Sequence, residues 1–214
     1  MKRCFVSKKV SLIDCGSGNI LSVARAFKHI EVDVQIVNSE KDIIESDRLI
    51  FPGVGAFSNV ISYINKNKLF SSISNFCSSG KPFLGICLGM QVLFEESEEF
   101  GKYKGFGFIE GKISPIRNSY NNKLKIPHTN WNSLYINDKC NSQLKPFLSN
   151  GLQMYFSHSY MAIPRKNKHI LAHTLYGGIE ITAIVQKDNL IGCQFHPEKS
   201  GKDGLYFLKS FMDI

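Results

Sequence analysis

The chain has 214 residues, of which 43% are hydrophobic and 21% are charged. This ordinary globular composition excludes disordered and fibrous proteins, and the length favours one domain over residues 1–214. No apolar run reaches the ~18 residues of a membrane span, and no apolar block follows the basic residues near the N-terminus. We therefore expect a soluble, cytoplasmic protein.

Lysine and arginine outnumber aspartate and glutamate by 26 to 18, which gives a net charge of +8. The basic residues are scattered along the chain, and no more than two are adjacent. This distribution favours a solvated basic surface over a nucleic-acid footprint. An acidic protein partner remains open.

The six cysteines are irregularly spaced and form no Cys-x-x-Cys pair. Neither a zinc site nor a dithiol redox centre is indicated, and free thiols fit a reducing compartment. We expect most of them to be small buried hydrophobic residues. The sequence indicates no metal and no cofactor.

The first half of the chain alternates strand and helix patterns. Strands are predicted at 9–13, 32–36, 48–51 and 82–86, and helices at 19–30, 39–45, 57–65, 69–78 and 88–96. Such alternation predicts parallel strands joined by right-handed crossovers. The expected fold class is therefore α/β, with an open, mostly parallel sheet flanked by helices.

The second half is predicted to be mostly strands, which extend the sheet in antiparallel fashion. Strands are expected at 106–109, 112–116, 131–136, 153–160, 169–176, 179–186 and 190–195, and a last helix at 203–212. Residues 187–189 resemble a hairpin turn, and 118–125 and 137–143 are expected surface loops.

A Gly-x-Cys-x-Gly pattern at 85–89 stands between a predicted strand and its helix. The pattern is typical of a nucleophile elbow in which sulfur replaces oxygen, with glycines leaving room for a strained turn. The elbow would place Cys87 at the carboxyl ends of the strands and at a helix N-terminus, which favours the thiolate. The alternative is a buried structural cysteine in a glycine-rich turn.

The segment His196-Pro197-Glu198 follows a predicted strand, 109 residues after Cys87. A nucleophilic thiol needs a base, and that base needs a group that fixes its orientation. His196 and Glu198 supply both functions. Alone, His196 would be an ordinary core or surface histidine.

The sequence Pro52-Gly53-Val54-Gly55-Ala56-Phe57 ends another predicted strand. Flanking glycines allow backbone N–H groups near Gly53 and Val54, with that of Leu88, to form an oxyanion hole. The alternative is a simple turn leading into a helix. A partial dinucleotide-binding pattern at 16–19 lacks its third glycine and is rejected.

The chain closely resembles the class I glutamine amidotransferases, nearly from end to end. Residues 85–91 and 194–200 resemble the signatures of the whole class. Four further segments resemble the glutaminase subunits of imidazole glycerol phosphate synthase, the HisH family: 18–23, 52–57, 127–132 and 155–160. The resemblance implies a flavodoxin-like fold.

The resemblance also implies roles for individual residues. The catalytic triad would be Cys87, His196 and Glu198, and the glutamine substrate would be held by Gln91, Ser157, His158 and Ser159. Glu99 is a candidate for binding the substrate's ammonium group or, alternatively, part of a solvated helix end. Trp131, Asn132 and Lys199 would lie near a partner interface, where Lys199 would pair with a carboxylate or remain a surface lysine.

The implied partner is HisF, a (β/α)₈ cyclase that would receive ammonia in a heterodimer and make imidazole glycerol phosphate and AICAR in histidine biosynthesis. Cys15 and Asn130 depart from the family pattern and are expected to affect the partner-facing surface. The departure at Asn130 leaves open a second function, in which the chain donates ammonia for the amidation of a bacterial surface sugar. An inactive binding subunit and a cysteine peptidase are further alternatives, which the intact triad and Gln91 respectively disfavour.

Overall fold

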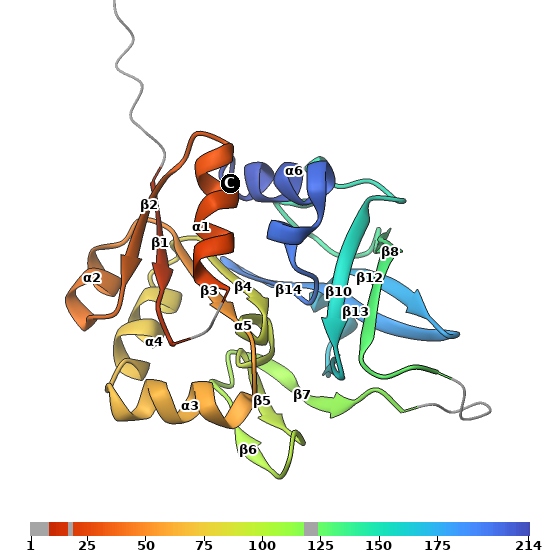
Figure 1. Ribbon diagram of the computed structural model, residues 1–214, viewed down its shortest axis with the longest axis horizontal. Coiled ribbons are helices and arrows are strands. Elements are labelled where there is room, and N and C mark those ends of the chain that lie inside the picture. Colours follow the sequence, from red (N-terminus) through yellow and green to blue (C-terminus); the bar gives the residue numbers. More distant parts are fainter. Residues whose placement is uncertain (1–8, 17–18, 118–123) are drawn as a thin grey trace, which may run out of the picture.

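The computed structural model describes residues 9–16, 19–117 and 124–214 (Figure 1). Gly18 of the 18–23 segment and most of the expected loop at 118–125 lie outside these residues. No helix within them is long and apolar enough to cross a membrane.

An eight-stranded mixed sheet forms the centre of the molecule, in the order β2-β1-β3-β4-β14-β13-β12-β9. The strands in this order are Asp33–Val37, Lys9–Ile13, Leu49–Gly53, Phe83–Cys87, Leu190–Cys193, Ile179–Lys187, Ile170–Tyr176 and Tyr135–Ile136. Pairing is parallel from β2 to β14 and antiparallel from β14 to β9. This arrangement confirms the predicted parallel sheet with an antiparallel extension.

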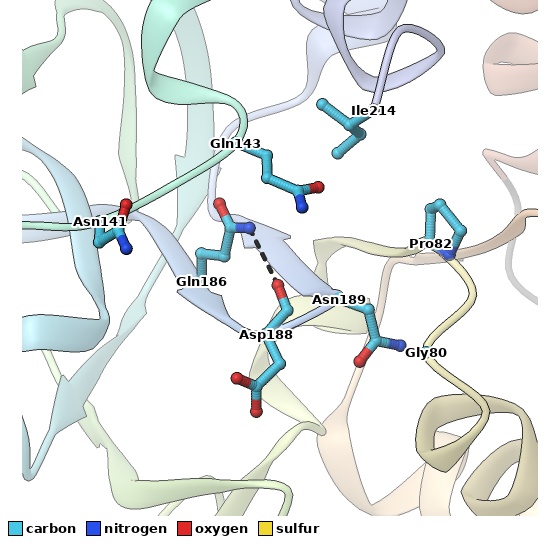
Figure 2. A pocket seen from close by; sticks show the side chains of 8 residues that line it. All are labelled: Gly80, Pro82, Asn141, Gln143, Gln186, Asp188, Asn189 and Ile214. Atoms are coloured by element: carbon cyan, nitrogen blue, oxygen red, sulfur yellow. Dashed lines mark hydrogen bonds between the residues drawn. The ribbon is translucent and has the colours of Figure 1, made fainter.

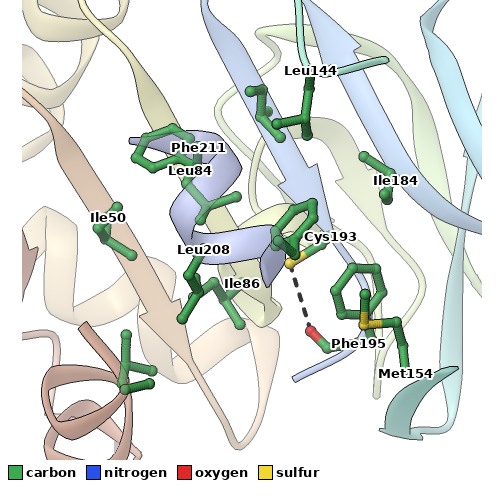
Figure 3. Close-up of a cluster of buried hydrophobic side chains, with 14 of the residues drawn as sticks. Ile50, Leu84, Ile86, Leu144, Met154, Ile184, Cys193, Phe195, Leu208 and Phe211 are labelled. Atoms are coloured by element: carbon green, nitrogen blue, oxygen red, sulfur yellow. Dashed lines mark hydrogen bonds between the residues drawn. The ribbon is translucent and has the colours of Figure 1, made fainter. Parts of the chain in front are cut away.

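Helices cover both faces of this sheet. Helices α1 (Ile20–His29) and α6 (Gly201–Phe211) pack on one face, and α2 (Glu40–Glu45), α3 (Phe57–Lys66) and α4 (Phe70–Ser78) on the other. Alternation along the buried strands divides the core in two, because successive side chains point to opposite faces. In β4, for example, Leu84 and Ile86 pack with α6 (Figure 3), whereas Phe83 belongs to the cluster on the other face of the sheet.

Two smaller sheets complete the fold. One has the order β11-β7-β5-β6, and the other pairs β10 with β8. Their bounds are β5 Phe94–Ser97, β6 Tyr103–Lys104, β7 Ile109–Pro115, β8 His128–Ser133, β10 Gln153–His158 and β11 Tyr160–Pro164. Three 3₁₀ turns within the described residues are η1 Lys145–Phe147, η2 Asn167–His169 and η3 Pro197–Lys199.

The predicted helix at 88–96 is wrong over most of its length. Helix α5 spans only Leu88–Gln91, and the chain continues as β5. The backbone carbonyls of Val92, Leu93 and Phe94 accept hydrogen bonds from Phe106, Ile109 and Gly107, respectively, at 2.8–3.0 Å. Pairing with a distant segment therefore overrides the local helical pattern.

Four other predicted strands differ in their limits. The segment 106–109 is largely irregular, and its last residue begins β7, which also contains all but the last residue of the strand expected at 112–116. The segment 131–136 breaks at the fully buried Leu134 into β8 and β9, which pair in different sheets. The segment 153–160 breaks at Ser159 into β10 and β11 for the same reason.

The predicted hairpin turn at 187–189 is confirmed. A two-residue turn, Asp188-Asn189, joins β13 to β14 with Lys187 paired to Leu190. At the start of α2, Ser39 is the N-cap residue and accepts a hydrogen bond from the Asp42 backbone N–H at 3.2 Å.

Candidate active site

Cys87 occupies a strained turn between β4 and α5. Its φ of 54° lies in the left-handed region that non-glycine residues rarely adopt. A Cβ at Gly89 would lie 1.8 Å from the Phe51 carbonyl oxygen, and one at Gly85 would lie 2.4 Å from the Gly89 oxygen. Both glycines are therefore required by close backbone packing around the turn, as an elbow demands.

The elbow places Cys87 at the wall of a cavity of about 320 Å³. The residue is only 7% exposed, yet it is not sealed within the core because it borders this cavity. Most of the predicted site residues share the lining, which comprises Val54, Gly55, Cys87, Leu88, Gln91, Glu99, Pro127, Ser157, His158, Ser159, Tyr160, His196 and Lys199. The volume suits a small molecule.

His196 and Glu198 meet beside the sulfur. His196 Nδ1 lies 2.9 Å from Glu198 Oε1, and both side chains are almost fully buried. Backbone contacts hold the imidazole in place, since the His196 N–H donates to Tyr155 O and its carbonyl accepts from the Ser200 hydroxyl. Burial lowers the pKa of His196, but the Cys87 thiolate and the Glu198 carboxylate outweigh burial and raise it to about 10.

Two side chains at this centre received no role from the sequence. Asn19 Nδ2 donates to Glu198 Oε1 at 3.2 Å. Gln194 Nε2 lies 3.6 Å from Cys87 Sγ. Both residues belong to segments that carry the family resemblance, and this was the only signal in the sequence that pointed to them. Nothing in their spacing predicts these contacts.

The expected oxyanion segment lies beside the elbow. Gly53 pairs with Cys87 across β3 and β4, and a Cβ at Gly53 would lie 3.1 Å from the Leu88 Cβ. Val54 and Gly55 continue along the cavity, and Gly55 has a φ of 102°. The structure thus brings Gly53, Val54 and Leu88 together around the thiol.

Glu99 reaches the same segment from the far side of the cavity. Its carboxylate accepts a hydrogen bond from the Phe57 N–H, at the first residue of α3. Burial raises the pKa of Glu99 and outweighs this hydrogen bond, which lowers it. Glu99 is therefore part of the cavity, not of a solvated helix end.

The remaining substrate candidates form the opposite wall. Gln91 donates to Tyr160 O at 3.2 Å, and Ser157, His158 and Ser159 follow one another at the end of β10. His158 Nδ1 lies 2.7 Å from Tyr160 O. Burial lowers the pKa of His158 to about 3, so its imidazole is neutral at physiological pH.

The three candidate partner residues occupy the neighbouring surface. Trp131 is 48% exposed and packs edge-on against Tyr155, and the Lys199 ammonium lies 6.0 Å from the centre of the same ring. Asn132 is tied into the fold by hydrogen bonds to His128 Nε2 and Leu175 O.

The two departures from the family pattern lie in different places. Asn130 is exposed on β8 and accepts a hydrogen bond from the Trp131 N–H. Cys15 is 6% exposed, and its sulfur lies 3.6 Å from Pro52 O. Cys15 therefore packs in the core whereas Asn130 is exposed, and the expected effect of either residue on a partner-facing surface stays a prediction.

A second cavity, of about 420 Å³, lies at the opposite end of the sheet (Figure 2). Pro82 precedes β4 and Asn189 precedes β14, so this cavity stands at the amino ends of strands whose carboxyl ends approach Cys87. Its lining holds carboxamides and Asp188 but neither cysteine nor histidine. The larger volume therefore does not identify the reactive site.

The doubly wound sheet with a thiol on its elbow, beside an imidazole and a carboxylate, defines an enzyme class that transfers acyl groups through cysteine. A family model described as glutamine amidotransferase class-I matches residues 11–213. The chain belongs to the class I glutamine amidotransferase family.

Curated relatives of the chain are named as HisH subunits. The chain is 44% identical over 211 residues to imidazole glycerol phosphate synthase subunit HisH 1 of Legionella pneumophila (strain Lens), covering 96% of the chain and 99% of the relative. It is 41% identical to subunit HisH of Lactococcus lactis, with 96% and 98% covered. Within its class, the chain therefore belongs to the HisH family.

Solved structures share the fold. The structure of PurLQS from Thermotoga maritima aligns with a TM-score of 0.75 at 17% identity, covering 97% of this chain and 98% of that one. A crystal structure of a glutamine amidotransferase aligns with a TM-score of 0.69 at 16% identity, covering 96% and 99%.

Proposed function

We propose that this chain is the glutaminase subunit of an imidazole glycerol phosphate synthase in the cytoplasm. It hydrolyses L-glutamine to L-glutamate and ammonia and passes the ammonia to a HisF-type cyclase partner for histidine biosynthesis. The observation that carries the proposal is the elbow thiol of Cys87 beside the His196–Glu198 pair, in a chain with HisH relatives over nearly its whole length.

The first chemical step is attack of the Cys87 thiolate on the carboxamide carbon of glutamine. Nδ1 of His196 faces Glu198, which leaves Nε2 for the thiol. The carbonyl oxygen gains negative charge in the tetrahedral intermediate, and the backbone N–H groups of Gly53, Val54 and Leu88 stabilise it. One such donor is worth about 2.7–4 kcal/mol in the transition state.

In the second step the tetrahedral intermediate breaks down. His196 is protonated beside the thiolate and donates its proton to the departing nitrogen, which leaves as ammonia. Neutral His196 then takes a proton from water, whose oxygen attacks the thioester and releases glutamate. Glu198 keeps the imidazole oriented through both transfers.

The product explains the need for a partner. In bulk water, ammonia becomes ammonium, which is not nucleophilic, so it must pass directly to an acceptor site. The partner-facing residues Trp131, Asn132 and Lys199 lie near the cavity. Lys199 both borders the cavity and extends into solvent, where it would pair with a carboxylate of the cyclase.

The test combines the purified chain with its cognate cyclase and supplies either glutamine or an ammonium salt. We expect Cys87→Ala to abolish glutamine-dependent synthesis of imidazole glycerol phosphate while ammonium-dependent synthesis by the cyclase survives. Glutamine-dependent synthesis by this variant would refute the nucleophile assignment.

Cys77 supplies the matched control. It is 6% exposed, and it lies on α4, away from the cavity. Cys77→Ala removes a buried thiol of the same size and should keep glutamine-dependent synthesis.

If the unchanged chain stimulates no synthesis with the cyclase but supports amidation of a nucleotide-linked sugar, the acceptor assignment is wrong and the glutaminase chemistry stands.

A further inference from the structure

Gln194 is a buried side chain that the mechanism above does not use. It is 0% exposed and directly follows β14. Its backbone N–H donates to Ala183 O at 2.9 Å, which fixes the main chain. The carboxamide lies between Gln91 and Cys87, within hydrogen-bond distance of both.

A backbone carbonyl determines which way this carboxamide points. Tyr160 O accepts hydrogen bonds only, so the group of Gln91 that faces it at 3.2 Å must be the NH₂. The same NH₂ faces Gln194 at 3.0 Å, so Gln194 presents its carbonyl oxygen there. Its own NH₂ must then face Cys87 Sγ, at 3.6 Å.

A hydrogen-bond donor fixed in this position stabilises negative charge on the sulfur. A hydrogen bond to an ionised acceptor is stronger than one to a neutral acceptor, so the carboxamide N–H favours the thiolate over the thiol. Unlike the imidazolium of His196, a carboxamide does not give up its proton. It therefore stabilises the thiolate without neutralising it.

We propose that Gln194 is a permanent hydrogen-bond donor to the Cys87 sulfur and that Gln91 and the Tyr160 carbonyl set its direction. The donor stabilises the thiolate before substrate binds and again when the thioester is hydrolysed. The inference rests on the proposed function, because it assumes that Cys87 is the nucleophile.

The test measures alkylation of Cys87 by iodoacetamide from pH 5 to 10 in the full-length chain, with the Cys87 peptide quantified by mass spectrometry. Gln194→Met keeps a side chain of similar length without a donor. We expect the pH midpoint of labelling to rise by about one unit, with a roughly tenfold lower rate below the midpoint. Gln194→Glu, which places an acceptor against the sulfur, should raise it further.

The direction of the carboxamide is tested separately. Gln91→Met releases Gln194 from its fixed orientation and should produce a smaller rise of the midpoint. Gln186→Met is the matched control, since Gln186 is also buried but lies on β13 near the second cavity. It should leave the labelling profile unchanged, and thermal melting of each variant verifies folding.

The outcomes separate this inference from the proposed function. A folded Gln194→Met or Gln194→Glu chain with an unchanged midpoint overturns the role of Gln194 while the triad stands. If Cys87 of the unchanged chain is labelled no faster than Cys77 or Cys193, both of which are deeply buried, the nucleophile assignment fails as well.

Discussion

The carboxylate of Glu198 is held at one oxygen by two donors. Oε1 contacts both His196 Nδ1 and Asn19 Nδ2, whereas Oε2 is buried without a hydrogen-bond partner among the described residues. Because the second oxygen makes no such contact, the orientation of the carboxylate depends on Asn19 as well as on the imidazole. We therefore expect Asn19 to position the proposed triad from the start of α1.

Replacing Asn19 by alanine tests this arrangement. Asn19 is the N-cap residue of α1, but its side chain makes no capping hydrogen bond, so its loss should cost the helix little. We expect Asn19→Ala to lower kcat for glutamine hydrolysis roughly tenfold, equivalent to about 1.4 kcal/mol, with KM nearly unchanged. Steady-state kinetics of the complex with the cyclase measure both constants.

Ser22→Ala is the control for this variant, because Ser22 lies on the same helix and its backbone N–H bonds to Asn19 O. A rise in KM with kcat intact in Asn19→Ala would assign the residue to substrate binding instead.

At the scale of elements, the junction of β4 with α5 is closely packed against β3. Gly89 of α5 packs directly against the backbone of β3, and Gly53 of β3 packs against Leu88. The elbow therefore fixes the oxyanion segment and the thiol relative to each other. A small shift here separates groups that must act on one carbonyl.

Gly89→Ala tests how much of the fold depends on this contact. The new Cβ would lie 1.8 Å from Phe51 O, so β3 and α5 must separate. We expect the free energy of unfolding in urea to fall by about 3 kcal/mol or more. Gly80→Ala is the contrast, because Gly80 has a φ of 79° but no atom within 4 Å of its Cβ, and it should cost about 1 kcal/mol. Gly89 itself has no positive φ, so a loss no larger than that of Gly80→Ala would show that the close approach of Gly89 to β3 does not limit the fold.

The sequence predicted the elements of the parallel core well because the periodicity that identifies each of them is contained within a few neighbouring residues. Periodicity placed β1, α1, β3 and α4, and the glycine spacing placed the elbow at Cys87. It failed at residues 88–96, where the buried run Val92–Phe94 pairs with residues 106–109, a contact that no local pattern contains. For the same reason it missed Asn19 and Gln194, whose partners lie 179 and 107 residues away.

At the scale of the whole molecule, two histidines connect the cavity to β8, the strand that carries Trp131 and Asn132. His158 Nε2 on β10 lies 3.0 Å from His128 Nδ1 on β8, and His128 Nε2 lies 3.0 Å from Asn132 Oδ1. Neutral His158 donates through Nδ1 to Tyr160 O, so its Nε2 carries no proton, and a neutral His128 has one N–H to share between this nitrogen and Asn132 Oδ1. We therefore expect a change in the contacts of Asn132 to reach His158 at the wall of the cavity.

This buried pair makes the stability of the whole chain sensitive to acid. The pKa of His158 is about 3 in the folded state, so its imidazole takes up a proton near pH 6.5 only when the chain unfolds. Burial also lowers the pKa of His128, which acts in the same direction. Because the unfolded state then binds more protons, the free energy of unfolding should fall as the pH drops from 6.5 to 5, by about 1 kcal/mol per pH unit for His158 alone. Glu98 and Glu110, whose pKa values are lowered, reduce the free energy of unfolding only at lower pH.

Urea unfolding from pH 6.5 to 5 measures how steeply the free energy of unfolding depends on pH. His158→Gln should reduce this slope, while the exposed His29→Gln leaves it unchanged. A slope that His158→Gln leaves at its full value would mean that this imidazole is already protonated in the folded chain.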